Sequence, residues 1–189
     1  MTAANPRIPY TYDDYCTLPE DMSRRYELLH GDFYMVPAPT TRHQRILKRL
    51  NSIVQRQVDG FRLGEALFSP VDVILGQGSG REVVQPDLVF VGTERLGIIK
   101  LHGIEGPPDL VVEILSPGTA ERDRGYKLTM YARYGVREYW IVDPDLCIVD
   151  VYRAGPSAYL APRRYNRGEV VTCALLRDLR VSLCDVFAE

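Results

Sequence analysis

The sequence predicts a mixed α/β (α+β) fold, in which a central mixed β-sheet is flanked by helices. Hairpin-like strand pairs, an amphipathic helix and a short apolar strand segment succeed one another along the chain, followed by a second helix and a returning strand. Such alternation is typical of a mixed sheet with helices packed on its faces. With 189 residues, 46% of them hydrophobic, the chain is expected to form a single domain, 1–189, with a substantial core.

The N-terminal part of the chain predicts a hairpin and then a helix. Strand-forming residues at 26–29 and 33–36 flank a Gly-Asp turn, which indicates a hairpin over about 24–37. Apolar residues recur at helical spacing over 41–58, and a threonine can cap the start. We therefore expect an amphipathic helix there, whose other side carries arginines and no acid.

The middle of the chain predicts a second hairpin and a buried strand. Residues 71–75 and 83–91 have the pattern of two strands, and a glycine-rich turn at 76–80 separates them. The segment 110–115 is short and apolar, and prolines bound it on both sides. We expect it to form a strand that is covered on both faces.

The last third of the chain predicts a helix and several strands. The helix should run over about 120–134 and end at Gly135, and a strand should follow at 138–142. Further short strands are expected at 147–152, 159–165 and 169–174, within a C-terminal part of about 147–189.

Composition argues against several classes of protein and site. The four cysteines include no C-x-x-C pair and the three histidines no H-E-x-x-H frame, which argues against disulfide and zinc frameworks. No apolar run approaches the ~20 residues that cross a bilayer, so we expect no membrane partner. The segment 1–10 lacks an apolar core region and a basic leader, so we expect a cytoplasmic location. The net charge of -2 gives no argument for nucleic acid.

Two carboxylates interrupt apolar segments and need partners. Asp87 follows Pro86 inside the run 83–91, and Glu113 lies in the middle of 110–115, where an unpaired charge is costly to bury. On neighbouring strands the two acids can meet at one sheet edge, where at ~4 Å and an effective dielectric near 20 they would repel by about 4 kcal/mol. A divalent ion removes that conflict, and oxygen-only ligands suit Mg²⁺ or Mn²⁺ better than zinc.

A lysine in the following helix could reach the same place. Lys127 shares a helical stripe with Asp123 and Arg124 before it and Tyr131 after it. Beside a metal ion, a lysine can orient the attacking water and stabilise charge on a phosphoryl oxygen, as phosphodiester hydrolysis requires. A plain ion pair between Lys127 and Glu113 would use the same geometry, and the residues alone do not separate the two interpretations.

Five short motifs together resemble a known family. They are Tyr26-Glu27-Leu28 with Gly31, Pro86-Asp87-Leu88-Val89, PDLVVEILSP at 108–117, Asp123-Arg124 with Lys127 and Tyr131, and GVREYWIVDP at 135–144. Pro86-Asp87, Glu113 and Lys127 resemble the PD-(D/E)XK nuclease superfamily, and the whole set is similar to the Uma-type restriction-endonuclease-like family. Each motif alone is weak, but the combination is specific.

The resemblance implies a set of catalytic residues. It implies that Asp87 and Glu113 hold a metal ion together with the backbone carbonyl of Ile114. The superfamily places its lysine two residues after the acid, where this chain has Leu115. Lys127 matches the lysine that the Uma-type family carries in the following helix, and it is the third expected catalytic residue.

The resemblance also implies a fold and a function. The expected restriction-endonuclease-like core covers about 41–143 and consists of a helix, three strands, a helix and a strand. The expected activity is a metal-dependent endonuclease that hydrolyses phosphodiester bonds in DNA and acts as a homodimer. The alternative is a non-catalytic module that binds nucleic acid or protein with the same fold and keeps a structural ion pair at the former active site.

Other residues are weaker candidates for the site. Glu27 and His43 match family positions and could line it, although for His43 we favour a hydrogen-bonded core histidine. Arg124 and Tyr131 are further candidates for the lining. The arginine side of the first helix is either a solvated face or a contact for nucleic-acid phosphates. Its candidate contact residues are Arg42, Arg45 and Arg49.

Overall fold

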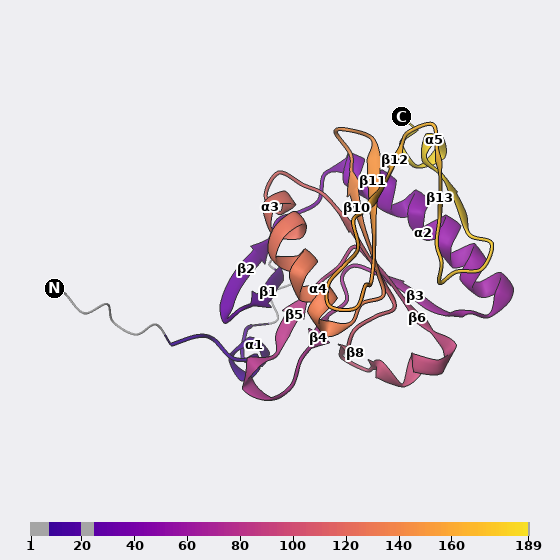
Figure 1. Ribbon diagram of the computed structural model, residues 1–189. Coiled ribbons are helices and arrows are strands. Elements are labelled where there is room, and N and C mark those ends of the chain that lie inside the picture. Colours follow the sequence, from indigo (N-terminus) through magenta and orange to yellow (C-terminus); the bar gives the residue numbers. More distant parts are fainter. Residues whose placement is uncertain (1–7, 20–24, 189) are drawn as a thin grey trace.

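Two six-stranded sheets form the framework of residues 8–19 and 25–188, which the computed structural model describes (Figure 1). The sheet with the longer strands, called the larger sheet below, has the order β12-β11-β10-β9-β6-β3. Its strands are β3 (Gly64–Phe68), β6 (Leu88–Gly92), β9 (Leu110–Ile114), β10 (Glu138–Asp143), β11 (Ile148–Arg153) and β12 (Arg163–Asn166). Strands β9 and β10 are parallel and the other neighbours are antiparallel. The sheet is therefore mixed, as the sequence predicts.

The smaller sheet has the order β2-β1-β5-β4-β8-β7 and includes the expected N-terminal hairpin. Its strands are β1 (Arg25–Leu29), β2 (Asp32–Val36), β4 (Val73–Leu75), β5 (Glu82–Val84), β7 (Ile99–Lys100) and β8 (Gly103–Glu105). A separate pair near the C-terminus consists of β13 (Val170–Thr172) and β14 (Arg180–Ser182).

Two long helical segments flank the larger sheet. The first is α2 (Thr41–Phe61), and the Thr40 hydroxyl caps it by accepting from the His43 backbone N–H. The second is continuous through α3 (Ala120–Arg122), the π-helical turn η3 (Asp123–Lys127) and α4 (Leu128–Tyr134), and Gly135 ends it with a φ of 88°. The shorter helices are α1 (Tyr12–Cys16), η1 (Gly78–Gly80), η2 (Thr93–Ile98) and α5 (Leu183–Val186).

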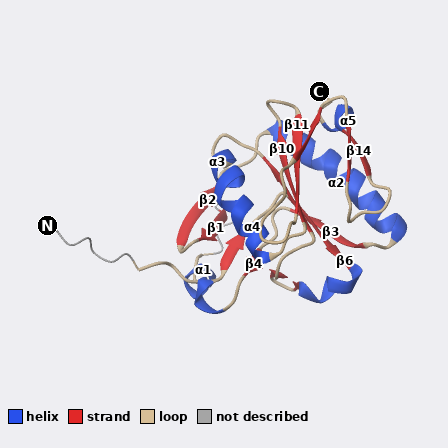
Figure 2. Ribbon diagram, in the orientation of Figure 1, coloured by secondary structure: helices blue, strands red, loops and turns tan. Residues whose placement is uncertain are grey.

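Strand β9 lies between two apolar layers, and its alternating side chains divide between them. Leu110, Val112 and Ile114 pack in the cluster that contains the apolar face of α2. Val111 packs in the opposite cluster, with α4 and the smaller sheet. Figure 2 shows α2 and α4 on opposite sides of the strands. By the same alternation Glu113 points to the side of α4, so strand register decides which helix can supply its partner.

The structure differs from the sequence prediction at several elements. The run 83–91 is not one strand, because it divides at Gln85–Asp87 and its two halves belong to different sheets. The N-terminal hairpin turns at His30 and Gly31, both with positive φ, whereas we expected a Gly-Asp turn. Of the strand expected at 159–165, only its last residues join β12.

Three expectations touch residues that the structure does not describe. The first seven residues of the segment 1–10, residue 24 of the hairpin and residue 189 of the C-terminal part lie outside the described ranges. All four cysteines lie within them and are free thiols. Over the described ranges, none of the helices has both the length and the apolar character to span a membrane.

Candidate active site

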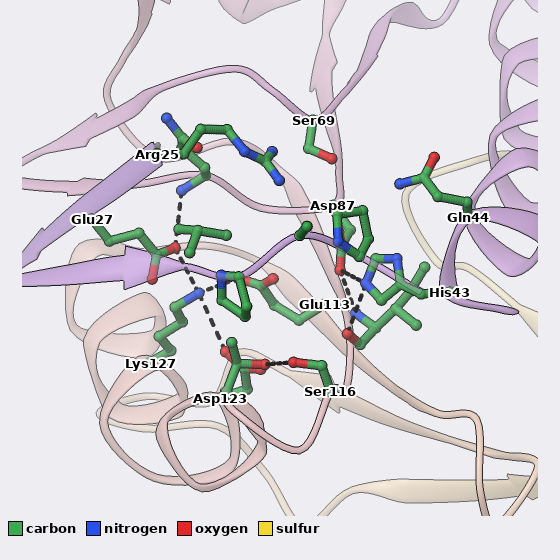
Figure 3. Close-up of a pocket in the computed structure, with 17 residues that line it drawn as sticks. Arg25, Glu27, His43, Gln44, Ser69, Asp87, Glu113, Ser116, Asp123 and Lys127 are labelled. Atoms are coloured by element: carbon green, nitrogen blue, oxygen red, sulfur yellow. Dashed lines mark hydrogen bonds and ion pairs between the residues drawn. The ribbon is translucent and has the colours of Figure 1, made fainter. Parts of the chain in front are cut away.

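A small pocket opens where three distant segments of the chain meet (Figure 3). Strand β6 begins there directly after Asp87, β9 ends there just past Glu113, and η3 brings Lys127 to the same place. The pocket has a volume of about 50 Å³ and is lined by 17 residues, which include Glu27 and His43. The three side chains expected to be catalytic therefore face one pocket.

Asp87 lies where the chain passes from one sheet to the other. Pro86 has no backbone N–H, so the strand ladder of β5 cannot continue through it. Oδ2 of Asp87 accepts a hydrogen bond from the backbone N–H of Ile114 at 2.7 Å. Nε2 of His43 lies 3.2 Å from the same Oδ2 and 3.1 Å from the carbonyl oxygen of Ile114. A carboxylate oxygen and a carbonyl oxygen thus converge on one point beside Glu113.

His43 comes from the first turn of α2 and is 8% exposed. Both partners of its Nε2 are acceptors, so this nitrogen must carry a hydrogen. Its Nδ1 is buried and has no hydrogen-bond partner among the described residues. Burial acts to lower the pKa of His43, but the hydrogen bond and the charge of Asp87 outweigh it, and the pKa is raised. His43 is therefore a hydrogen-bonded buried histidine, as we favoured, and it also lines the pocket.

Lys127 is the centre of a buried cluster of charges. Its Nζ donates to Oε1 of Glu27 at 2.8 Å and to Oε1 of Glu113 at 3.0 Å, and it lies 3.2 Å from Oδ1 of Asp123. The hydroxyl of Tyr131, one turn further along the helix, donates to the same Oε1 of Glu113 at 2.9 Å. Lys127 is only 3% exposed, so solvent does little to screen these contacts.

The surrounding charges determine the protonation state of Lys127. Burial alone would lower the pKa of Lys127, but the surrounding carboxylates, Glu113 first among them, hold it well above its usual value. Burial raises the pKa of Glu113 well above its usual value, against the opposing charge of Lys127. Lys127 is therefore an ammonium group at neutral pH, which can donate hydrogen bonds but cannot accept a proton.

A second set of contacts holds Glu27 in place. Its Oε1 accepts from the backbone N–H of Gln85 at 3.1 Å, and its Oε2 lies 3.6 Å from Nη1 of Arg122. The guanidinium group of Arg122 stacks over the ring of Tyr34. The β1–β2 hairpin thus closes one side of the pocket, as the prediction of Glu27 as a lining residue requires.

Two of the weaker candidates do not line the pocket. Arg124 points away from it, because its guanidinium pairs with Asp143 at 2.7 Å and with Asp150 at 3.5 Å. The expectation that it lines the site is wrong: it lies one residue after Asp123 and so on another side of the helix. Tyr131 also lies outside the pocket lining, but it contacts the site through Glu113.

The arginines of α2 lie at a different hollow. Arg42, Arg45 and Arg49 line a cavity of about 490 Å³ together with Arg167. Two of them also make structural contacts, since Arg42 pairs with an exposed carboxylate, that of Asp145, and Arg49 donates to the carbonyl of Val186 at 3.2 Å. Arg45 and Arg167 have no ion pair with a described residue. Arg45 is therefore the arginine of the predicted set that makes no ion pair with a described residue.

Sequence reasoning missed two charged residues of the pocket. The spacing of four residues places Asp123 on the same helical stripe as Lys127, but Asp123 is not among the site residues that the sequence predicts. Arg25 also lines the pocket. It directly precedes the motif Tyr26-Glu27-Leu28, and since side chains alternate along a strand it shares a face with Glu27.

The donor atoms of the pocket fit a hard divalent cation. The carboxylates of Asp87 and Glu113 and the carbonyl of Ile114 are all oxygen donors, and two of these groups already converge on one hydrogen-bond donor, His43. Within the described part of the chain, no three His, Cys, Asp or Glu side chains are grouped as a metal site. Mg²⁺ commonly uses only one or two protein carboxylates, so two are sufficient.

Comparison with known proteins finds a family model and a solved structure that are both described as "putative" nucleases. Residues 12–184 match the family model Uma2, described as "Putative restriction endonuclease". An uncharacterised protein of Synechocystis sp. is 26% identical over 156 residues, which is 80% of each chain. The crystal structure of a "putative nuclease" of Anabaena variabilis, from the family DUF820, superposes with a TM-score of 0.79 over 95% of this chain and 98% of that one, at 22% identity. At this identity, the similarity between the two structures is one of fold.

Proposed function

Because this chain belongs to the Uma2 family of restriction-endonuclease-like proteins, we propose that it is a metal-dependent endonuclease that hydrolyses phosphodiester bonds in DNA. The observation that carries the proposal is the meeting of Asp87, Glu113 and Lys127, from three separate segments, around one pocket. Two acids and a lysine from these positions are the set that the sequence resemblance assigns to catalysis.

In this proposal Asp87, Glu113 and the carbonyl of Ile114 hold Mg²⁺ or Mn²⁺. Restriction-endonuclease-like nucleases usually use divalent metals. Such an ion supplies charge stabilisation at the phosphoryl oxygens and makes water a stronger nucleophile at neutral pH. Hydrolysis joins a water oxygen to phosphorus and breaks the bond to one sugar oxygen, which leaves with a proton.

The side chains of this chain have distinct roles in the proposal. Lys127 is an ammonium group, so it acts by donating hydrogen bonds to water or to a phosphoryl oxygen, and not as a base. Tyr131 orients the carboxylate of Glu113 through its 2.9 Å hydrogen bond. His43 Nε2 contacts both Asp87 Oδ2 and the carbonyl oxygen of Ile114, so it would hold these two oxygens in place beside a bound cation.

The hollow lined by the arginines of α2 is the proposed path of the nucleic acid beyond the pocket. The same first turns of α2 carry His43 at the pocket and the arginines at the hollow. Arg45 and Arg167 are the members available for phosphates, since Arg42 and Arg49 already contact protein groups. A DNA strand could therefore contact both places at once.

A homodimer and a cytoplasmic location complete the proposal. Two cuts on opposite strands of a duplex suit a two-fold assembly, and light scattering on the purified protein measures this directly. Four free thiols are what a reducing compartment favours.

A non-catalytic binding module is the second candidate, and one observation favours it. Lys127 and Glu113 already satisfy each other at 3.0 Å, and Leu115 occupies the usual lysine position of the superfamily. In that case the charged cluster would be structural. Titration calorimetry with Mg²⁺ separates the two, because an ion pair alone gives no saturable binding of the metal and the proposed site does.

The cleavage test uses conservative changes that keep the hydrogen bonds of the pocket. Asp87→Asn and Glu113→Gln should each lower Mg²⁺-dependent cleavage of plasmid DNA by about 10² or more, because each removes a charge at the reacting site. Glu94→Gln, which removes an exposed acid from η2, should cleave as the wild type does. Cleavage that persists in both pocket variants, or a wild type without cleavage in either metal, contradicts the proposal.

A further inference from the structure

One cation of the pocket is not used by the proposed mechanism. Arg25, the first residue of β1, is among the residues that line the pocket, and its side chain extends toward Ser69 and Asp87 (Figure 3). Among the described residues, no carboxylate lies within ion-pair distance of its guanidinium group. The residue as a whole is half-buried.

The acids of the pocket do not need Arg25, because other groups already satisfy them. Glu27 and Glu113 both bind Lys127, and Glu113 also accepts from a tyrosine hydroxyl. Asp87 accepts from a backbone N–H and bonds to His43. Arg25 therefore adds positive charge to the pocket, and it is more exposed than Glu113 and Lys127, so a ligand that comes from solvent can contact it.

An oxyanion is the ligand that this arrangement suits. A guanidinium group presents parallel N–H donors that match two oxygens of one phosphate, and it stays charged at every physiological pH. The carboxylates of the pocket would repel a phosphate if no cation faced it. The half-buried Arg25 and a hard cation held by Asp87 and Glu113 would both attract the phosphate.

We propose that Arg25 is a substrate-binding residue whose guanidinium group binds the two non-bridging oxygens of the DNA phosphodiester at this pocket. The inference rests on the proposed function and deepens it, because it assigns the group that recognises the substrate anion. Asp87, Glu113 and Lys127 would act on the phosphodiester that Arg25 orients.

The test compares Arg25→Met and Arg25→Lys with Arg177→Met as the matched loss of an exposed charge. Arg177 is 77% exposed and lies beside Gln57, about 21 Å along α2 from His43. In single-turnover cleavage of a labelled DNA duplex, Arg25→Met should lower kcat/KM by roughly 10²–10³, as loss of one oriented donor does. Arg25→Lys should recover only part, because an ammonium group is a point charge.

Three readouts distinguish this role from a structural one. For Arg25→Met, the Mg²⁺ concentration that gives half-maximal cleavage should stay within about twofold of that of the wild type. Added guanidinium ion should restore part of the cleavage by Arg25→Ala. Inorganic phosphate should inhibit the wild type more than it inhibits Arg25→Met. Cleavage by Arg25→Met within threefold of the Arg177→Met control overturns the inference. So does inhibition by phosphate that is equal in the wild type and Arg25→Met.

Failure of the proposed function gives a different pattern. If the wild type does not cleave DNA with either metal, the nuclease proposal fails. Fluorescence anisotropy then measures binding of the same duplex in Mg²⁺, which tests whether Arg25 binds the phosphodiester. Arg25→Met should then bind at least about tenfold more weakly than Arg177→Met, as loss of a charge-assisted hydrogen bond predicts. Equal binding by the two variants overturns the role of Arg25.

Discussion

Replacing Lys127 with methionine should lower the free energy of unfolding by about 3–5 kcal/mol, the usual cost of removing one partner from a buried ion pair. The ammonium group contacts the buried carboxylates of Glu27, Glu113 and Asp123 at 2.8, 3.0 and 3.2 Å. Methionine keeps much of the aliphatic chain, so the loss is mainly one of charge. At ~2–4 °C per kcal/mol for a chain of this size, Tm should fall by roughly 6–20 °C.

Equilibrium unfolding in urea measures this loss. The control is Lys100→Met, a change at an exposed lysine, whose free energy of unfolding should stay within about 0.5 kcal/mol of that of the wild type. Burial already raises the pKa values of Glu113 and Asp123, and without the opposing charge of Lys127 these two values rise further. The deficit should therefore be largest at mildly alkaline pH, below the ordinary lysine pKa of about 10.4, and shrink as pH falls toward about 4, where the unfolded acids also take up protons. A deficit below about 1 kcal/mol at neutral pH, or one that does not change with pH, would refute the account of the cluster.

Three further predictions concern the same pocket and its surroundings. Burial raises the pKa of Glu113, so the free energy of unfolding of the wild type should decline as pH rises above the ordinary pKa of a glutamate. Thermal melts from about pH 5 to pH 8 measure this decline, which should be smaller for Glu113→Gln. Tyr131→Phe removes the hydrogen bond to Glu113 and should lower the free energy of unfolding by about 1.5–3 kcal/mol in urea titrations, whereas an unchanged midpoint would mean that this bond contributes nothing. If Arg45 contacts a phosphate, Arg45→Met should reduce the slope of log affinity against log salt by about 0.9, and parallel slopes for variant and wild type would place Arg45 outside the interface.

Much of the fold could be predicted because its signals are local. The apolar spacing over 41–58 indicates α2, and the structure extends this helix to Phe61. The apolar run 110–115 indicates a buried strand, and all residues of β9 are buried. The division of 83–91 between two sheets could not be predicted, because it depends on which strands pair over long distances in the sequence. The single-domain organisation remains our proposal.

The candidate site could be predicted where a buried charge contradicts its surroundings. Glu113 in an apolar strand indicates a cationic partner, and the structure places Lys127 there. Arg124 was assigned wrongly because a helical stripe extends over several residues and only tertiary contacts decide which of them face inward. Arg25 gave no signal of its own, since an arginine at the start of a strand is ordinary until its neighbours in space are known.

A crystal structure with Mn²⁺ tests the central claim most directly, because anomalous scattering identifies the ion and its ligands together. The account predicts one manganese in the pocket, bound by Asp87, Glu113 and the carbonyl oxygen of Ile114. A pocket without manganese at a saturating concentration, or an ion held by none of these three groups, would contradict it.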